Sequence, residues 1–290
     1  MIFLILSNFL YAYNNLLWKR ILSKFDLWLI IGLRCLLTSF IGLTLILLFY
    51  SNIFSAITYS VSLSIFIASI LGAFGLISMI LALKEGSLTQ LGIFNLLIVF
   101  FISSYLLLFE NIFLKNYTIA SIFIIFGFVG YVFQIKKVET AKNTHTFRHY
   151  MLFTMMAFFF SASILLHWYN LNQEIPAILS VTVQEIVVFF VVLIFFKFQT
   201  SLTTNQIYPQ TRKIFIPVLF MAIIIFSAIW TGFLGLKHTN PLISSLISLI
   251  TPVLTIVFGL LLYKDQWNYI TLISLFFITL GVYLINLEFL

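Results

Sequence analysis

Long apolar runs separated by short polar breaks make up the whole chain. Each run is close to the roughly twenty residues that an α-helix needs to cross a bilayer core. A barrel strand would instead show about ten residues of strict alternation. The pattern therefore predicts an all-α polytopic membrane protein with ten transmembrane helices: Ile2 to Trp18, Leu27 to Tyr50, Val61 to Leu83, Leu88 to Phe109, Tyr117 to Phe133, Tyr150 to Trp168, Ile175 to Phe196, Ile214 to Leu236, Pro241 to Tyr263 and Tyr269 to Leu287.

The most polar stretch lies between the fifth and sixth runs and reads QIKKVETAKNTHTFRH. We interpret it as a linker over residues 135–149, between a five-helix repeat over 1–134 and a second over 150–290. An odd number of spans in each half makes the halves enter the membrane in opposite senses. The sequence thus predicts two inverted five-helix repeats, with a site near the membrane midplane.

Matching positions in the two halves support a duplication. Runs three and eight both end in an LxLK pattern, and in each half an acidic residue follows the next run. The matched residues are Leu81, Leu83 and Lys84 with Leu234, Leu236 and Lys237 at an offset of 153, and Phe9, Ala12 and Trp18 with Phe159, Ala162 and Trp168 at an offset of 150.

The ninth run contains the main irregularity of the pattern. Asn240 and Pro241 suit the start of a helix, and Thr251-Pro252 interrupts the run near its middle. Proline removes one backbone donor and frees a carbonyl, which a cavity can hydrate. We expect one span with a kink at half depth and Pro252 as its hinge.

Composition agrees with the membrane class and excludes others. The chain is 62% hydrophobic and 8% charged, with a mean hydropathy of +1.17. Its net charge of +7 lies in short breaks, without the aromatic-interleaved patch that nucleic acid needs. The single cysteine, Cys35, lies in an apolar run, and no Walker, HExxH or GxSxG motif occurs. We therefore expect no metal, no cofactor and no catalytic residues.

The chain resembles the drug/metabolite transporter superfamily, specifically the EamA-type ten-span transporters. The resemblance rests on the five-plus-five plan, Arg34 in GLRCLLTSF, the LxLK ends, and the proline and acidic exit of run nine. The chain departs from a symmetric pattern where Val99 matches Pro252 and Gln184 matches Arg34. The resemblance implies a secondary transporter of small organic metabolites, amino-acid-like or drug-like, that works by alternating access. It also implies that spans one, three, four, six, eight and nine line the cavity.

The orientation of the termini has two conflicting predictions. Nearly all loop lysines and arginines follow odd-numbered spans, so the positive-inside rule places both termini outside the cell. Proteins of the resembled family are commonly drawn with both termini in the cytosol. The sequence leaves this question open.

Two charged residues lie inside predicted spans. Glu185 sits near the middle of span seven, where an ionisable group costs roughly 2.5 to 3.5 kcal/mol and must face protein or water. It could couple protons to transport or lock helices together, and the sequence leaves both roles open. Arg34 lies early in span two, where we favour helix bracing over anion binding.

Other polar and aromatic residues in the spans are candidates for substrate binding: Tyr11, Asn14, Asn95, Trp230 and Ser248. His167 lies beside Trp168 near the end of span six, and we favour an interfacial aromatic-belt position for it. Gln184 points about 100° away from Glu185 on an ideal helix, so we expect the two not to line one cavity equally.

The alternative function is a membrane-embedded enzyme or lipid-handling protein that uses Glu185 or His167 as an acid or base. We favour this alternative less than transport, because Glu185 and His167 are isolated and the sequence shows no paired acid and base. The expected partners are a small-molecule substrate and the lipid bilayer, with a homodimer left open and nucleic acid excluded. The expected location is the plasma (inner) membrane of a bacterium.

Overall fold

The structure is a computed structural model. It describes residues 1–50, 59–110, 119, 122–127, 129–130, 146–173, 175–199, 204–239, 241–248, 250–264 and 269–286. Of the predicted fifth span, residues 119, 122–127 and 129–130 are described and helical, whereas the rest of that span and most of the predicted linker, including residues 135–145, lie outside the described residues.

The described part of the chain is helical, as the apolar runs predict. Besides residues 122–127 and 129–130, which are also helical, it forms ten helices. Six of them are long and apolar enough to cross a membrane; these span-length segments lie within α2, α3, α4, α6, α7 and α8. The helices are α1 (Ile2–Leu22), α2 (Leu27–Phe49), α3 (Tyr59–Glu85), α4 (Leu88–Phe109), α6 (Thr146–Asn172), α7 (Ala177–Gln199), α8 (Thr204–Lys237), α9 (Pro241–Ile247), α10 (Ile250–Tyr263) and α11 (Tyr269–Asn286).

Local chemistry fixes where α2 and α4 begin. The Asp26 side chain accepts a hydrogen bond from the Leu29 backbone N–H at 3.0 Å. Ser87 and Gln90 form a capping box, in which each side chain accepts from the other residue's backbone N–H. Both arrangements satisfy backbone donors that a helix start leaves unpaired.

Two helices begin earlier than the predicted apolar runs. Helix α6 begins at Thr146, inside the stretch that the sequence assigns to the linker. Helix α8 begins at Thr204, ten residues before the predicted start, and contains Pro209 and Pro217. The first part of α8 contains polar residues, because a helix can extend beyond the membrane. A prediction based on apolar runs therefore does not detect it.

The ninth span is two helices and not one kinked helix. Helix α9 ends at Ile247 and α10 begins at Ile250. Two backbone hydrogen bonds lie at the break: the Ser248 N–H donates to the Ser244 carbonyl, and the Thr251 N–H donates to the Ser248 carbonyl. Pro252 therefore lies in the first turn of α10, where its missing N–H leaves no bond unmade.

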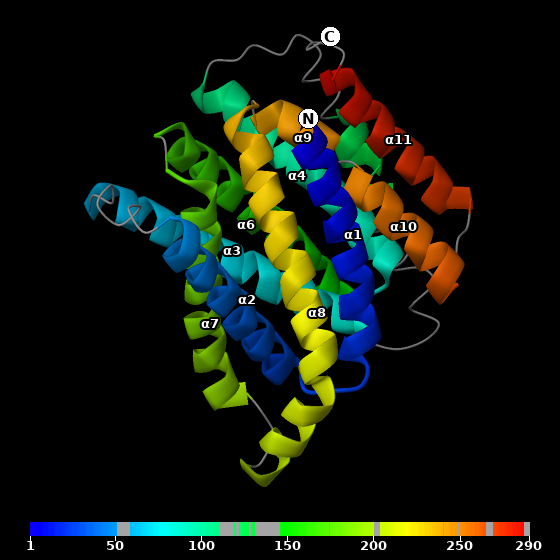
Figure 1. Cartoon of the computed structure of the whole chain (residues 1–290). Helices are drawn as coiled ribbons and strands as arrows, with labels where there is room; N and C mark the ends of the chain where they lie inside the picture. Colours follow the sequence, from blue (N-terminus) through cyan, green and yellow to red (C-terminus); the bar gives the residue numbers. More distant parts are fainter. Residues whose placement is uncertain are drawn as a thin grey trace.

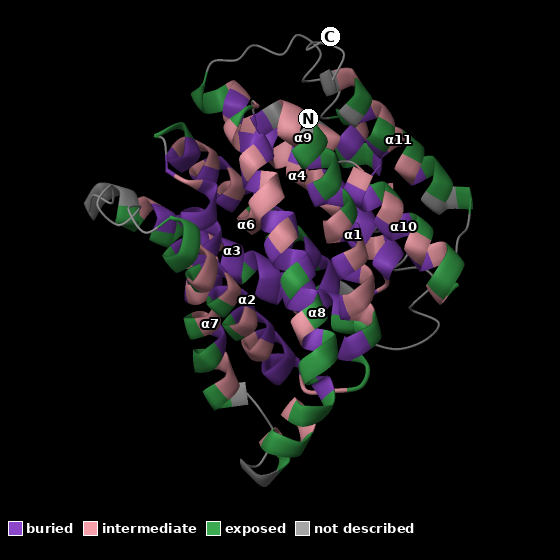
Figure 2. Cartoon of the chain, in the orientation of Figure 1, coloured by how far each residue is buried: buried purple, intermediate pink, exposed green. Residues whose placement is uncertain are grey.

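The most extensive contacts join the first half of the chain to the second. Figure 1 shows α1 beside α8 near the middle of the bundle, and α2 crossing α7. Helix α3 packs against α6, and α4 packs against α10. Buried residues gather on the faces that meet inside the bundle, while outward faces carry the exposed residues (Figure 2).

Candidate functional site

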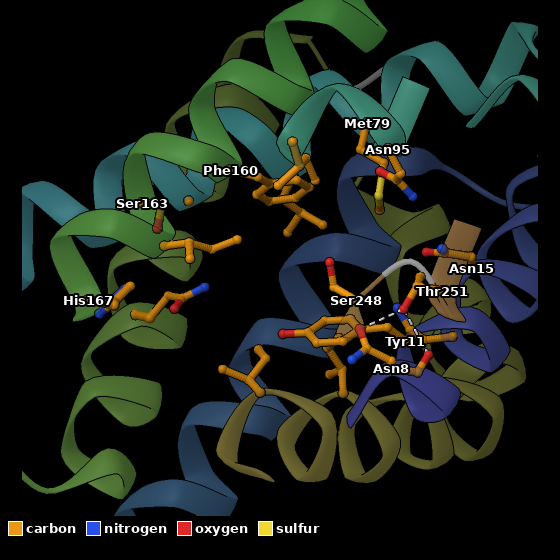
Figure 3. Close-up of a pocket in the computed structure, with 18 of the residues that line it drawn as sticks. Asn8, Tyr11, Asn15, Met79, Asn95, Phe160, Ser163, His167, Ser248 and Thr251 are labelled. Atoms are coloured by element: carbon orange, nitrogen blue, oxygen red, sulfur yellow. Dashed lines mark hydrogen bonds between the residues drawn. The ribbon is translucent and has the colours of Figure 1, made fainter. Parts of the chain in front are cut away.

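A cavity of about 210 Å³ lies between the two halves of the bundle (Figure 3). Its walls come from α1, α2 and α3, from α4, α6 and α7, from α8, and from the α9–α10 break with the start of α10. The six predicted spans therefore contribute, and spans two and seven contribute as well. The main polar lining residues are Asn8, Tyr11, Asn14, Asn15, Arg34, Asn95, Ser163, His167, Gln184, Glu185, Ser248 and Thr251.

Most of the sequence-predicted site residues line this cavity. Tyr11, Asn14, Asn95 and Ser248 lie in its wall, as does Pro252. Whether they bind substrate stays a prediction.

Trp230 lies elsewhere. It packs beside buried apolar residues that include Ile225 and Phe226, with its ring 5.8 Å from that of Phe226, and it is not among the described residues that line the cavity. An indole in an apolar span can face a neighbouring helix as readily as a cavity, and residue type alone does not separate the two.

Arg34 and Glu185 meet in the cavity wall. The Arg34 Nη2 donates to the Glu185 Oε2 at 2.8 Å, and both side chains are 2% exposed. The Arg34 guanidinium also lies 6.0 Å from the centre of the Trp18 ring, within range of a cation–π contact. Arg34 therefore pairs inside the protein and does not extend to the membrane interface.

This ion pair ties α2 to α7 at their crossing. A buried charge pair compensates the loss of hydration only through close contact and further hydrogen bonds. Removal of one partner would leave the other charge buried and uncompensated. The arrangement favours the bracing role, and it also holds the Glu185 carboxylate in a bond with Arg34.

Asparagines of α1 hold the start of α10 against the cavity. The Thr251 hydroxyl lies 2.9 Å from the Asn8 Oδ1 and 3.0 Å from the Asn8 carbonyl (Figure 3). One turn further, the Asn15 Nδ2 donates to the Thr255 Oγ1 at 3.3 Å. The α9–α10 break is thus fixed to α1 by side chains that also line the cavity.

His167 lies in the cavity wall and not in an interfacial belt. It is 1% exposed, and its ring centre is 4.5 Å from that of Phe233. Gln184 lies beside it, and Figure 3 places His167 and Ser163 on the same wall. Gln184 and Glu185 both line the cavity, and whether they do so equally stays a prediction. The cavity is wide enough to contact adjacent positions of α7.

Sequence reasoning missed Asn8, Gln184 and Thr251 as site residues. Asn8, Tyr11 and Asn15 repeat at helical spacing and therefore share one face of α1. That polar stripe is a usable signal in an apolar span. Thr251 stands out in the sequence only as the neighbour of Pro252.

One end of the bundle is closed by a dense aromatic cluster. The Phe94 ring lies 5.4 Å from that of Phe153 and 5.8 Å from that of Tyr150. Trp18 belongs to the same core, and Trp18 and Phe153 are 0% exposed. Gln90 donates to the Tyr150 hydroxyl at 3.1 Å and joins α4 to α6 at this end.

The fold and the cavity define a polytopic helical membrane protein with an interior site shared by both halves. The model of the EamA-like transporter family matches residues 148–287, which is close to half of the chain. The second half of the chain is therefore similar to the EamA-like transporter family, as the sequence motifs predict.

Solved structures support the fold over the whole length. Twenty-three chains match. One of them, titled "Crystal structure of protein", has a TM-score of 0.61 and 14% sequence identity, and the match covers 97% of this chain and 98% of that chain. No curated protein matches the sequence significantly.

Proposed function

We propose that the protein is a secondary transporter that moves small organic metabolites across a membrane by alternating access. The observation that carries this proposal is the cavity, which helices of both halves build in the interior of a membrane-spanning bundle. Such a site at the repeat interface is what alternating access requires. The members of the family are transporters, which favours this function over the acid–base enzyme.

An inverted repeat is part of the proposal, and the packing supports it. Helix α3, the third span of the first half, packs against α6 and α7 of the second half. Helix α8, the third span of the second half, packs in the same way against α1 and α2 of the first half. At the α2–α7 crossing, a side chain at Gly42 would meet Thr182, and one at Gly32 would meet Val192. At an offset of 150, Gly42 corresponds to Val192 and Gly32 corresponds to Thr182. The two contacts are therefore equivalent, as a two-fold relation between the halves requires.

The two ends of the bundle differ in a way that favours alternating access. Trp18, Phe94 and Phe153 are buried at the closed end. Their counterparts in the other repeat are Trp168 and Ile247, which are partly exposed, and Phe3, which is 48% exposed. In an inverted repeat these counterparts lie at the opposite end. A second state would bury them and open the aromatic cluster.

The rest of the proposal concerns location and partners. We place the protein in the plasma membrane of a bacterium, with a small-molecule substrate and the lipid bilayer as its partners and the two repeats at 1–134 and 150–290. The long apolar helices support a bilayer location. The molecular mass of the purified protein in detergent, compared with the 33.5 kDa of one chain, tests whether it forms a homodimer.

Transport is tested with purified protein in sealed liposomes and a panel of amino acids and small organic amides, acids and amines. We expect at least one solute to enter faster than into protein-free liposomes and to be chemically unchanged by mass spectrometry. Chemical conversion of a solute, without faster entry of any, would instead support the enzyme.

A further inference from the structure

The fixed charges of the cavity cancel. Among the described lining residues, Arg34 and Glu185 alone carry a formal charge, and they bind each other at 2.8 Å. A charged solute would gain compensation only by displacing one member of the pair, which would leave the other buried and unpaired. The cavity therefore disfavours solutes with a net charge.

Carboxamides supply much of the hydrogen bonding that the cavity offers. Asn8 and Asn15 already bond to Thr251 and Thr255. Asn14 is 2% exposed, and its Oδ1 is buried without a partner in the described part of the chain. Gln184 lies beside His167, and its Oε1 is buried without a hydrogen bond of standard geometry to described residues. These two amides retain hydrogen-bonding capacity for a solute.

The remaining lining is largely apolar and includes aromatic rings. Phe160 lies on α6 with Ser163 and His167, and Tyr11 lies on another wall of the cavity (Figure 3). Flat apolar surfaces suit a flat solute, because ring faces pack in offset or edge-to-face contact. The NH₂ and C=O of an Asn or Gln side chain can form two hydrogen bonds with a planar solute that has an acceptor and a donor side by side on one edge.

We propose that the cavity binds planar, net-uncharged solutes that carry an N–H donor beside a C=O acceptor, with Asn14 and Gln184 recognising this edge. Open carboxamides and lactams share this chemistry. The ion pair of Arg34 and Glu185 gives the cavity its preference for uncharged molecules. This inference rests on the proposed transport function, whose substrate class it specifies.

Four probes of similar size test it by equilibrium binding to the purified full chain in detergent: benzamide, 2-pyridone, benzoate and benzylammonium. We expect benzamide or 2-pyridone to bind and both ions to bind at least tenfold more weakly. Benzamide alone would assign open carboxamides, and 2-pyridone alone would assign lactams. Equal or tighter binding of either ion overturns the proposal, as does failure of both neutral probes to bind.

Variants test the two amides. Asn14→Leu and Gln184→Leu should each weaken binding of the neutral probe about tenfold, the effect of one lost hydrogen bond. Gln173→Leu is the matched control, because Gln173 is exposed at the end of α6 and outside the described lining. Full affinity in both cavity variants would overturn the assignment.

A gain of binding separates recognition from misfolding. Gln184→Glu keeps the side-chain size but replaces the amide with a carboxylate, so it should weaken benzamide binding and strengthen benzylammonium binding. A misfolded variant would gain nothing, and loss of both probes counts against Gln184 as the recognising side chain.

The binding panel does not depend on transport. Selective binding of neutral amides by a protein that moves no solute into liposomes would contradict the proposed function and leave the inference standing. Transport of benzoate or benzylammonium, with no binding of the neutral probes, would contradict the inference and leave the transport function standing.

Discussion

Arg34 and Glu185 form a buried ion pair in the cavity wall. Both side chains are 2% exposed and joined at 2.8 Å, so each holds the other's charge in an apolar environment. Arg34 also lies against Trp18, at the closed end of the bundle. The pair therefore connects the cavity wall with the aromatic cluster that closes one side.

Glu185→Gln should lower the free energy of unfolding by about 3 to 5 kcal/mol, because it leaves the Arg34 charge buried and uncompensated. The double variant Arg34→Met, Glu185→Met should recover most of this loss. Steric trapping in detergent measures the free energy of unfolding of the unmodified chain, the Gln variant and the double variant. A Gln variant as stable as the unmodified chain would contradict a bracing role.

The same Gln variant addresses coupling. If Glu185 only braces the helices, it carries no proton during transport. The variant should then take up solute more slowly than the unmodified chain, with the same dependence on pH. The measurement is initial uptake into liposomes over a range of pH values. A flattened profile would show that Glu185 takes part in proton coupling.

The α2–α7 crossing contains two glycines, Gly32 and Gly42, at positions related by the proposed repeat. A methyl group at Gly42 would come within 3.0 Å of the Thr182 Cβ, whereas one at Gly32 would lie 3.7 Å from the Val192 Cγ1. The first position is too close for a side chain and the second is at ordinary contact distance. One half of the crossing is thus packed more tightly than the other.

Gly42→Ala should destabilise the protein by about 1 to 3 kcal/mol through this overlap. Gly32→Ala is the matched control and should be neutral or stabilising by up to about 1 kcal/mol, because alanine favours helix. Thermal unfolding in detergent distinguishes the two. Equal effects would show that backbone propensity and not packing decides the outcome.

The α9–α10 break is the second element with a testable role. Pro252→Ala restores an N–H that can donate to the Ser248 carbonyl, so we expect the two helices to merge and transport to fall while expression is unchanged. Pro217→Ala is the control, because Pro217 is exposed inside α8, which continues through it. Spin-label distances across the break report the merger, and a normal transport rate would exclude Pro252 as a hinge.

The end of the bundle that holds Trp18, Phe94 and Phe153 is filled by buried side chains. Leu91 lies in this core and is 0% exposed. Its counterpart at an offset of 153 is Ser244, in α9, which is partly exposed. The two positions therefore report on opposite ends of the proposed pathway.

Cysteine labelling tests this asymmetry in a Cys35→Ala background, which removes the native thiol. An impermeant maleimide should label Ser244→Cys from one side of the membrane and leave Leu91→Cys unlabelled from both sides, because Leu91 is packed. Labelling of both positions at equal rates would contradict a closed end. The side on which Ser244→Cys reacts also resolves the conflict over orientation.

Local patterns determined the helical membrane fold. In lipid the backbone must satisfy its own hydrogen bonds, so a run of about twenty apolar residues has essentially one outcome. Polar residues in such runs are costly and must face protein or water, and for this reason the sequence alone distinguishes Tyr11, Asn14, Asn95 and Ser248 from their apolar neighbours. The family match over residues 148–287 agrees with the same motifs.

Features that depend on partners distant in sequence required the tertiary structure. Arg34 meets Glu185 across 151 positions, and no local pattern encodes that distance. Trp230 and Gln184 have similar apolar surroundings in the sequence, yet Trp230 packs near Phe226 while Gln184 lines the cavity. The sequence determined which residues cannot face lipid, because transfer energy is a property of the side chain. Only packing between helices decided which of them share a cavity.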